Sequence, residues 1–279
     1  MRLRSGARRE SPRMNPPNPD ARLWLFDFDN TLAALEREVD WPGSRRELEA
    51  SLRDAGIDEK IFVSIPKGNL PLYAALHTRW LRTSSTEANM PTAAQSHPRA
   101  QSIGSEGRPS RETAEALPRR CSEIIERHEL IGVERAQPTA GAIDLLEALV
   151  ARGAVVVIVT SNSSRTVARW LAIHGISDLV RAIVGRDSLL ALKPSPEMIM
   201  RALEITATPA AGAVFVGDSE ADFGAARAAA LGCYGIAVGH HARDRLVATC
   251  ATEVLASPAA LRIHLRLAPP KPACIKSNY

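Results

Sequence analysis

Short apolar runs alternate with helix-like segments along the chain from Gly141 onward. The run 154–160 consists mainly of β-branched residues without polar alternation, which is typical of a strand buried on both faces of a parallel sheet. An amphipathic segment, 141–152, precedes this run, and Gly175 supplies a C-terminal cap for the helix expected after it. Repeated units of this kind, joined by right-handed crossovers, predict an α/β fold with a doubly wound, Rossmann-like parallel sheet. The same alternation predicts strands at 180–184, 213–216 and 234–238 and helices at 163–174, 196–205 and 220–231, with 254–255 and 258–266 closing the domain.

A further strand-like run, 23–26, lies near the start of the chain and ends in two carboxylates. Asp27 follows the run directly, and Asp29 comes one residue later. Burying paired carboxylates costs free energy unless a cation or hydrogen-bond donors compensate, so the fold itself gains nothing from them. The pair suits an aspartate that attacks phosphorus beside a second carboxyl group that transfers a proton.

Three further polar motifs follow the first in a workable order. Thr160 ends the run 154–160, Lys193 lies within Leu-Lys-Pro-Ser-Pro-Glu, and Asp218 and Asp222 follow the strand expected at 213–216. In a doubly wound sheet, ligands bind at the carboxyl ends of the strands, where all four motifs fall. Each motif alone has a structural explanation, since an Asp after a strand often caps a helix. Their order predicts a shared site.

This motif order resembles that of the haloacid dehalogenase-like hydrolase superfamily, whose phosphatases share an Asp-x-Asp-x-Thr first motif. The resemblance covers roughly residues 22–265. It implies that Asp27 is the nucleophile and that Asp29 is the general acid and base. It also implies that Lys193 neutralises charge between the nucleophile and the phosphoryl group. The hydroxyl that contacts the phosphoryl oxygens corresponds to Thr160, with Ser161 and Asn162 beside it as further substrate-binding residues.

The resemblance implies Mg²⁺ as the cofactor. A phosphate dianion repels a carboxylate nucleophile, so a hard cation must lie between them, and Mg²⁺ takes oxygen ligands. The metal ligands implied are the carboxylates of Asp27 and Asp218 and the backbone carbonyl of Asp29. Asp222 lies about one helical turn after Asp218, where it can bind the metal or orient a metal-bound water.

Between Leu32 and Pro138 the strand signal nearly disappears, and helices are expected at 44–55, 70–81 and 119–131. This insertion resembles the helical cap of the superfamily. The expected organisation is a catalytic core at 22–32 and 138–267, a helical cap at 33–137 with a disordered segment at about 83–110, a disordered basic tail at 1–21 and a loose tail at 268–279.

One loop of the cap is a candidate specificity element. Residues 64–69 separate two expected cap helices and contain both Pro and Gly, which is typical of a tight loop. In capped relatives, a loop at about this position faces the active site. Lys67 could then bind a second anionic group of the substrate, such as the carboxylate of phosphoglycolate; an exposed turn lysine is the alternative.

Composition limits which classes of partner and which cellular compartment are expected. The formal net charge is +4, and the first twenty residues contain five Arg, a distribution typical of a solvated basic tail rather than of a nucleic-acid site. No apolar stretch is long enough to span a membrane or to serve as a secretory signal. The four Cys have no close spacing, so neither a zinc site nor a disulfide framework is indicated. We expect a cytoplasmic protein whose partner is a small phosphate ester, with no nucleic acid and no membrane.

The best interpretation of the pattern is a Mg²⁺-dependent phosphatase for a small, phosphoglycolate-like metabolite. A dehalogenase of the same superfamily would need neither Asp29 nor the metal-binding set. A phosphomutase of the β-phosphoglucomutase type has the same core motifs. A non-catalytic binding protein could dock partners through 83–110 or the basic tail, although no motif is broken. The pattern identifies neither the metabolite nor the oligomeric state.

Overall fold

The structure is a computed structural model that describes residues 15–65, 68–88, 111–237, 240–249 and 253–268. Its centre is a parallel sheet with the strand order β3-β2-β1-β4-β5-β6. The strands are β1 (Leu23–Phe26), β2 (Val155–Val159), β3 (Ala182–Val184), β4 (Ala213–Gly217), β5 (Gly232–Ile236) and β6 (Glu253–Leu255). The predicted α/β class with a doubly wound parallel sheet is confirmed.

Helices cover both faces of this sheet, because successive strand residues point to opposite faces. In β1, Trp24 and Phe26 pack into one hydrophobic layer, and Leu23 and Leu25 pack into the other. The first layer includes side chains of α5 (Ala142–Ala151), α6 (Ser164–Ile173) and α10 (Pro258–His264). The second includes side chains of α7 (Glu197–Thr206), α8 (Glu220–Ala228) and α9 (His240–Thr249). Helix α9 was not among the predicted elements, and neither was the short helix at 59–63.

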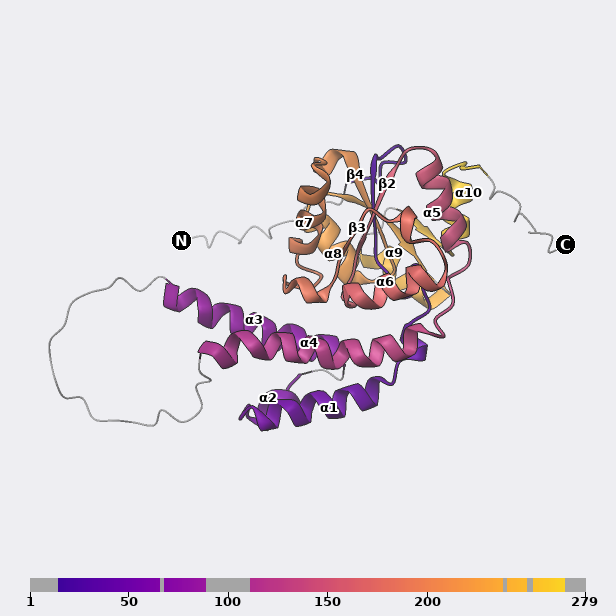
Figure 1. Cartoon of the computed structure of the whole chain (residues 1–279). Coiled ribbons are helices and arrows are strands. Elements are labelled where there is room, and N and C mark those ends of the chain that lie inside the picture. Colours follow the sequence, from indigo (N-terminus) through magenta and orange to yellow (C-terminus); the bar gives the residue numbers. More distant parts are fainter. Residues whose placement is uncertain (1–14, 66–67, 89–110, 238–239, 250–252, 269–279) are drawn as a thin grey trace, which may run out of the picture.

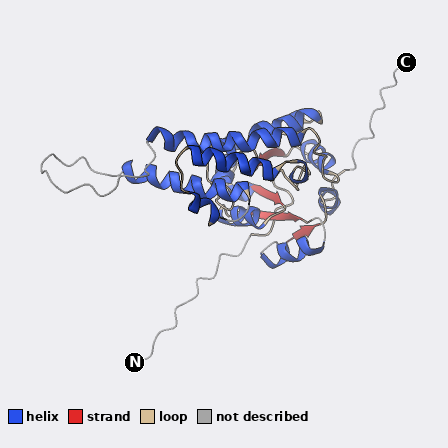
Figure 2. Cartoon of the chain, turned by 90° about the horizontal axis from the view of Figure 1, so that it is seen from below, coloured by secondary structure: helices blue, strands red, loops and turns tan. Residues whose placement is uncertain are grey.

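A layer of helices lies beneath this core (Figure 1). It comprises α1 (Trp41–Asp54), α2 (Glu59–Val63), α3 (Asn69–Ala88) and α4 (Arg111–Val133). Seen from below, these helices run alongside one another over one end of the sheet (Figure 2). Helix α4 packs against α1 and α3 within the layer and against α6 of the core. The assignment of 33–137 as a separate cap domain remains a proposal.

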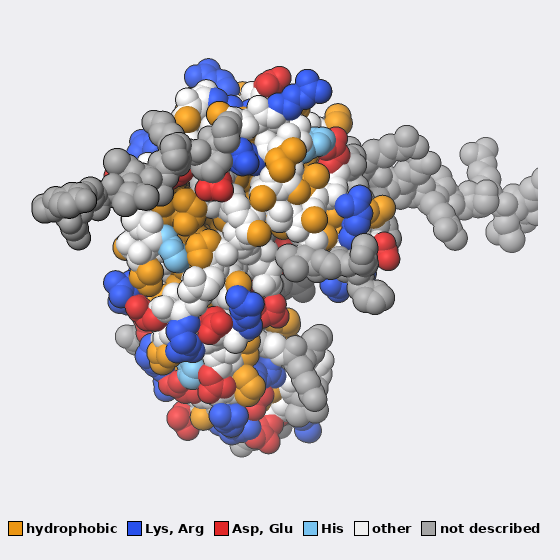
Figure 3. Space-filling model, turned by 90° about the vertical axis from the view of Figure 1, so that its right-hand side faces the viewer, with side chains coloured by type: hydrophobic (Ala, Val, Ile, Leu, Met, Phe, Trp, Pro, Cys, Tyr) orange, Lys and Arg blue, Asp and Glu red, His pale blue; other side chains and the backbone are white. Residues whose placement is uncertain are grey.

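Ion pairs accompany this contact between the layer and the core. Arg165 of α6 pairs with Glu126 of α4 at 2.8 Å, and Arg169 of α6 pairs with Glu134 at 2.6 Å. Within the layer, His128 lies 3.0 Å from Glu47. Side chains of both charges accordingly alternate over the lower, helical part of the face in Figure 3.

Two predicted boundaries differ from the structure. Residues 15–21, expected within a disordered tail, lie on the core: Asn15 donates a hydrogen bond to the Ala230 carbonyl, and Ala21 is buried. This approach is possible because Gly232 has no side chain, and a Cβ there would meet Pro16 and Pro17. Helix α3 also continues through 83–88, since extending a formed helix costs little even for polar residues.

The remaining residues of the predicted tails and of the segment 83–110 lie outside the described part of the chain. Within that part, none of the helices combines the length and the apolar character that a bilayer crossing requires.

Candidate active site

Three of the predicted site residues come from neighbouring strand ends. Asp27 follows β1, Thr160 follows β2 and Asp218 follows β4, and β1 lies between the other two strands. The backbone N–H of Asp27 donates to the Val216 carbonyl at 2.8 Å, which extends the pairing of β1 with β4 by one residue. The sheet therefore fixes where these side chains meet.

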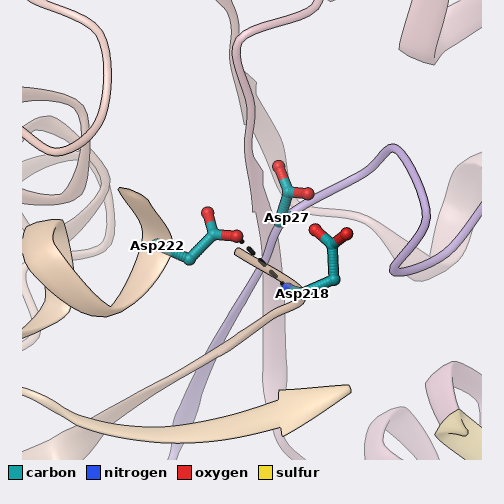
Figure 4. A group of neighbouring side chains, drawn as sticks. All are labelled: Asp27, Asp218 and Asp222. Atoms are coloured by element: carbon teal, nitrogen blue, oxygen red, sulfur yellow. Dashed lines mark hydrogen bonds between the residues drawn. The ribbon is translucent and has the colours of Figure 1, made fainter. Parts of the chain in front are cut away.

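The carboxylates of Asp27, Asp218 and Asp222 converge at this edge (Figure 4). One oxygen from each lies within 4.8 Å of the others. Burial raises the pKa of Asp218 to about 9, with the negative charges of Asp27 and Asp222 adding to the effect. Burial also raises the pKa of Asp27 to about 6, against the opposing attraction of Lys193. Burial and the neighbouring carboxylates thus both disfavour the charged form of Asp218.

Lys193 is the ammonium that joins two of these carboxylates. Its Nζ lies 2.5 Å from an Asp27 oxygen and 2.5 Å from an Asp222 oxygen, and only 4% of its side chain is exposed. It also contacts the Val159 carbonyl at the end of β2. Burial disfavours the charged form, but the attraction of Asp222 and Asp27 outweighs it and raises the pKa of Lys193. Lys193 is therefore a fixed positive charge beside Asp27.

Asp222 is engaged within the protein through both carboxylate oxygens. One accepts from Lys193, and the other accepts from the Ser219 hydroxyl and the backbone N–H groups of Asp218 and Ser219. Ser219 in turn caps α8 in a reciprocal capping box with Asp222. Asp222 thus holds the loop after β4 and Lys193 in place.

Asp29 lies on the turn that follows Asp27. One of its oxygens accepts from the backbone N–H groups of Leu35 and Glu36 at 3.0 and 2.8 Å. Burial raises the pKa of Asp29 to about 7, although these two bonds oppose the shift. The turn requires a left-handed residue, and Asn30 adopts a φ of 58°, a conformation that Asn tolerates better than most residues.

The loop after β2 presents Thr160, Ser161 and Asn162. The Thr160 hydroxyl donates to the Asn162 side-chain oxygen at 3.0 Å and accepts from the Asn162 backbone N–H. The backbone N–H groups of Thr160, Asn162, Ser163 and Ser164 all have acceptors. Ser161 lines the cavity described below. Among the described residues, no acceptor is found for its backbone N–H.

Sequence reasoning missed two buried residues beside this loop. Glu129 of α4 pairs with Arg186 at 2.8 Å, and both side chains are 0% exposed. Glu129 also accepts from the Asn162 side chain and from the backbone N–H of Ser163. A signal for Arg186 did exist, because it follows β3 and so falls at the same edge of the sheet as the other motifs. Glu129 lies in a helix among other charged residues and offers no such signal.

A cavity of about 610 Å³ opens over these groups. Its floor includes the predicted residues Asp27, Asp29, Thr160, Ser161, Asn162, Lys193 and Asp218. The helical layer contributes Trp41, Gly68, Asn69, Leu70, Pro71 and Ala74, and Glu36 lies at the same cavity. Lys67 lies outside the described residues, so its predicted contact with substrate stays a prediction. Its neighbour Gly68 does line the cavity.

Comparisons with known proteins agree with this architecture. A sequence model of the family described as haloacid dehalogenase-like hydrolase matches residues 91–236, more than half of the chain. The match includes Thr160, Lys193 and Asp218, whereas Asp27 and Asp29 precede it.

Several curated relatives carry the name phosphoglycolate phosphatase. The protein from Pseudomonas fluorescens (strain Pf0-1) is 33% identical over 101 residues, which cover 36% of this chain and 37% of that relative. The protein from Neisseria gonorrhoeae (strain ATCC 700825 / FA 1090) is 37% identical over 100 residues, covering 36% of this chain and 40% of the relative. The matches therefore span well under half the length of these relatives.

Solved structures share the fold over most of the chain. CbbY from Rhodobacter sphaeroides, crystallised in complex with phosphate, has a TM-score of 0.53 at 22% identity and covers 86% of this chain and 96% of its own. A predicted phosphatase from Clostridium acetobutylicum has a TM-score of 0.56 at 19% identity, covering 88% of this chain and 98% of its own. At these identities the likeness concerns the fold alone.

Proposed function

Because the chain belongs to the haloacid dehalogenase-like hydrolase family, we propose that it is a Mg²⁺-dependent phosphatase acting on a small phosphorylated metabolite through an aspartyl-phosphate intermediate. The observation that carries this proposal is the buried contact of Lys193 with Asp27 at the floor of a large cavity. Structural clusters of carboxylates lie at many protein surfaces, but this one faces a ligand-sized space and is tied to a lysine.

The donor set fits Mg²⁺. Carboxylate oxygens are ligands that this hard cation prefers. Burial, together with neighbouring carboxylates, raises the pKa values of Asp27 and Asp218, and a bound dication would stabilise their charged forms. Asp27, Asp218 and the Asp29 carbonyl would hold the metal. The oxygens of Asp222 are engaged by Lys193 and Ser219, so we assign it to orienting the site. Bound Mg²⁺ would offset charge between the nucleophile and the phosphoryl group.

The residues of the chain then divide the reaction into two steps. In the first, an oxygen of Asp27 forms a bond to phosphorus while the bond to the leaving alkoxide breaks, and Asp29 gives that alkoxide a proton. In the second, Asp29 takes a proton from the water that attacks phosphorus, and the bond to Asp27 breaks to release inorganic phosphate. A pKa of about 7 suits Asp29 to both tasks near neutral pH.

Phosphoryl oxygens also need hydrogen-bond donors from the protein. Lys193 supplies a fixed charge beside Asp27, and the backbone N–H of Ser161 is available in the loop after β2. The Thr160 hydroxyl donates to Asn162 in this structure, so it reaches a phosphoryl oxygen only by exchanging that partner. We therefore propose Ser161 as the primary donor of the loop, with Thr160 in support.

The size and lining of the cavity limit which organic groups the substrate can carry. The named relatives make phosphoglycolate a candidate. The volume of about 610 Å³ and the apolar wall of Trp41, Leu70 and Ala74 also accommodate a larger ester. Glu36 at the same cavity disfavours a second negative group by repulsion.

A phosphate-release screen over phosphoglycolate, sugar phosphates and aryl phosphates, with Mg²⁺ and with EDTA, tests the proposal. We expect Mg²⁺-dependent release, no turnover in Asp27→Asn, and wild-type turnover in the exposed control Asp178→Asn. Acid quenching should trap one phosphoryl group per wild-type chain and none on Asp27→Asn. Normal turnover in a folded Asp27→Asn protein would refute covalent catalysis. Isomerisation of a hexose phosphate without phosphate release would identify a mutase instead.

A further inference from the structure

Helix α4 reaches the loop after β2 through a buried ion pair. The Arg186 guanidinium follows β3, and the Glu129 carboxylate comes from near the C-terminal end of α4. Both side chains are 0% exposed, although burying an isolated charge is strongly unfavourable. A pair of this kind persists only when its hydrogen-bonding groups find partners.

Here the guanidinium is fully satisfied. Arg has five N–H donors, and each has an acceptor: two Glu129 oxygens, the Ser161 carbonyl at 2.7 Å, and the hydroxyl and carbonyl of Ser122. Ser122 and Glu129 lie on α4, whereas Ser161 lies on the loop after β2. The guanidinium therefore fixes the backbone of Ser161 against a helix of the layer.

Glu129 holds the other side of the same loop. One of its oxygens accepts from the Asn162 side-chain N–H at 3.0 Å, and the other accepts from the Ser163 backbone N–H at 3.1 Å. The Asn162 amide then accepts from the Thr160 hydroxyl. A continuous chain of hydrogen bonds thus runs from Arg186 through Glu129 and Asn162 to Thr160.

From this connection we infer that Arg186 and Glu129 are positioning residues for phosphoryl binding. The inference rests on the proposed function. Neither side chain lines the cavity, so neither touches the substrate. By clamping the Ser161 carbonyl and the Asn162 side chain, they fix the loop that carries the Ser161 N–H and the Thr160 hydroxyl, the groups proposed to bind the phosphoryl oxygens. Small displacements of such donors weaken binding to the transition state more than they weaken folding.

The test separates positioning from stability with matched variants. Arg186→Lys keeps the charge but cannot make five bonds. The double variant Arg186→Met/Glu129→Met removes both charges, so it should recover stability relative to Arg186→Met alone, because no unpaired buried charge remains. Asn162→Ala cuts the link to Thr160 without stranding a charge. The control is Arg165→Met. It breaks a different ion pair, the one that joins α6 to Glu126 of α4, where the Arg165 side chain is 75% exposed.

Inhibition by orthovanadate, which resembles the phosphoryl transition state, is measured beside the Mg²⁺ activation constant and the melting temperature. We expect inhibition about tenfold weaker or more in Arg186→Lys, in the double variant and in Asn162→Ala, with the Mg²⁺ constant unchanged, because the metal ligands lie on other strands. Arg165→Met should match the wild type.

Wild-type vanadate inhibition in the double variant or in Asn162→Ala would overturn the inference, as would an equal loss in Arg165→Met. A parallel loss of Mg²⁺ activation would overturn it too, because it would indicate general disruption of the site. A wild-type protein that is neither an Mg²⁺-dependent phosphatase nor inhibited by vanadate would instead remove the proposed function, and the inference with it.

Discussion

Replacing Lys193 by Met tests how the site tolerates its own negative charge. The Lys193 ammonium lies 2.5 Å from both Asp27 and Asp222, and the three side chains are at most 9% exposed. Met keeps an apolar stem of similar length but removes the charge. Breaking a buried pair in this way costs about 3–5 kcal/mol, which lowers Tm by roughly 6–10 °C at about 2 °C per kcal/mol for a chain of this size.

The loss should grow with pH. Burial raises the pKa of Asp27, and the charge of Lys193 opposes this rise, so the pKa lies at about 6. Without the ammonium, the folded-state pKa of Asp27 rises further above its ordinary value of 3.8, so the folded variant keeps a proton that the unfolded chain releases. The stability contributed by that proton is present at low pH and is lost as the pH rises toward the new pKa. The variant should therefore lie closest to the wild type near about pH 5 and furthest near about pH 8.

Thermal unfolding at these pH values, in EDTA and in Mg²⁺, measures both effects. Mg²⁺ should raise the Tm of Lys193→Met more than that of the wild type, because the metal supplies positive charge that the variant lacks. A site at a hundred times its Kd adds about 2.7 kcal/mol. Lys60→Met, at an exposed position of α2, is the matched control. Equal Tm values for Lys193→Met and the wild type at every pH, or the same Mg²⁺ shift in both, would refute the reasoning.

Three further predictions follow from the same geometry. Asp29→Asn should slow hydrolysis of an alkyl phosphate by about 10²- to 10⁴-fold, whereas an aryl phosphate should rescue the first step and let phosphoenzyme accumulate; equal losses with no trapped intermediate would mean that Asp29 only orders the site. Glu36→Gln should raise kcat/KM about threefold or more for phosphoglycolate but not for an aryl phosphate, because it removes a repelling charge from the cavity; no change in the ratio would exclude Glu36 from specificity. Burial lowers the pKa of His77 below its ordinary 6.5, so the unfolded chain binds protons first and stability should fall as the pH drops below 6.5, until the folded-state pKa is passed. His77→Gln should flatten that part of the stability curve, and an unchanged slope would assign it to other groups.

The strand-end residues could be predicted from sequence because two simple patterns coincide there. An apolar run marks the strand, and a polar residue directly after it marks the edge where ligands bind, as for Asp27, Thr160 and Asp218. The strand order then brings these residues together without any knowledge of side-chain packing. Lys193 follows no strand directly, and its prediction depended on its place in the order of motifs.

The clamp around Glu129 could not be predicted in the same way. A glutamate flanked by His128 and Leu130 on a helix has the pattern of an exposed residue, and the packing of α4 against the core buries it. The engagement of both Asp222 oxygens is another tertiary result, because spacing alone allows the carboxylate to face either the metal or the helix cap. Periodicity in the sequence specifies which face of a helix or strand is apolar. It does not specify which polar side chains form hydrogen bonds with each other.

The buried pair of Glu129 and Arg186 also limits how such a chain can be rearranged by recombination. The proposed cap, 33–137, lies in the sequence between β1 and β2 and, as a separate module, would be exchangeable for another helical layer. Removing it would take away Glu129 and Ser122, which accept four of the five hydrogen bonds of Arg186, and would leave the guanidinium with the Ser161 carbonyl as its one remaining acceptor among these partners. A graft would therefore succeed only if the incoming helix carried an acidic residue at the matching position, or if Arg186 changed with it. In this protein the buried pair therefore couples α4 to the sheet.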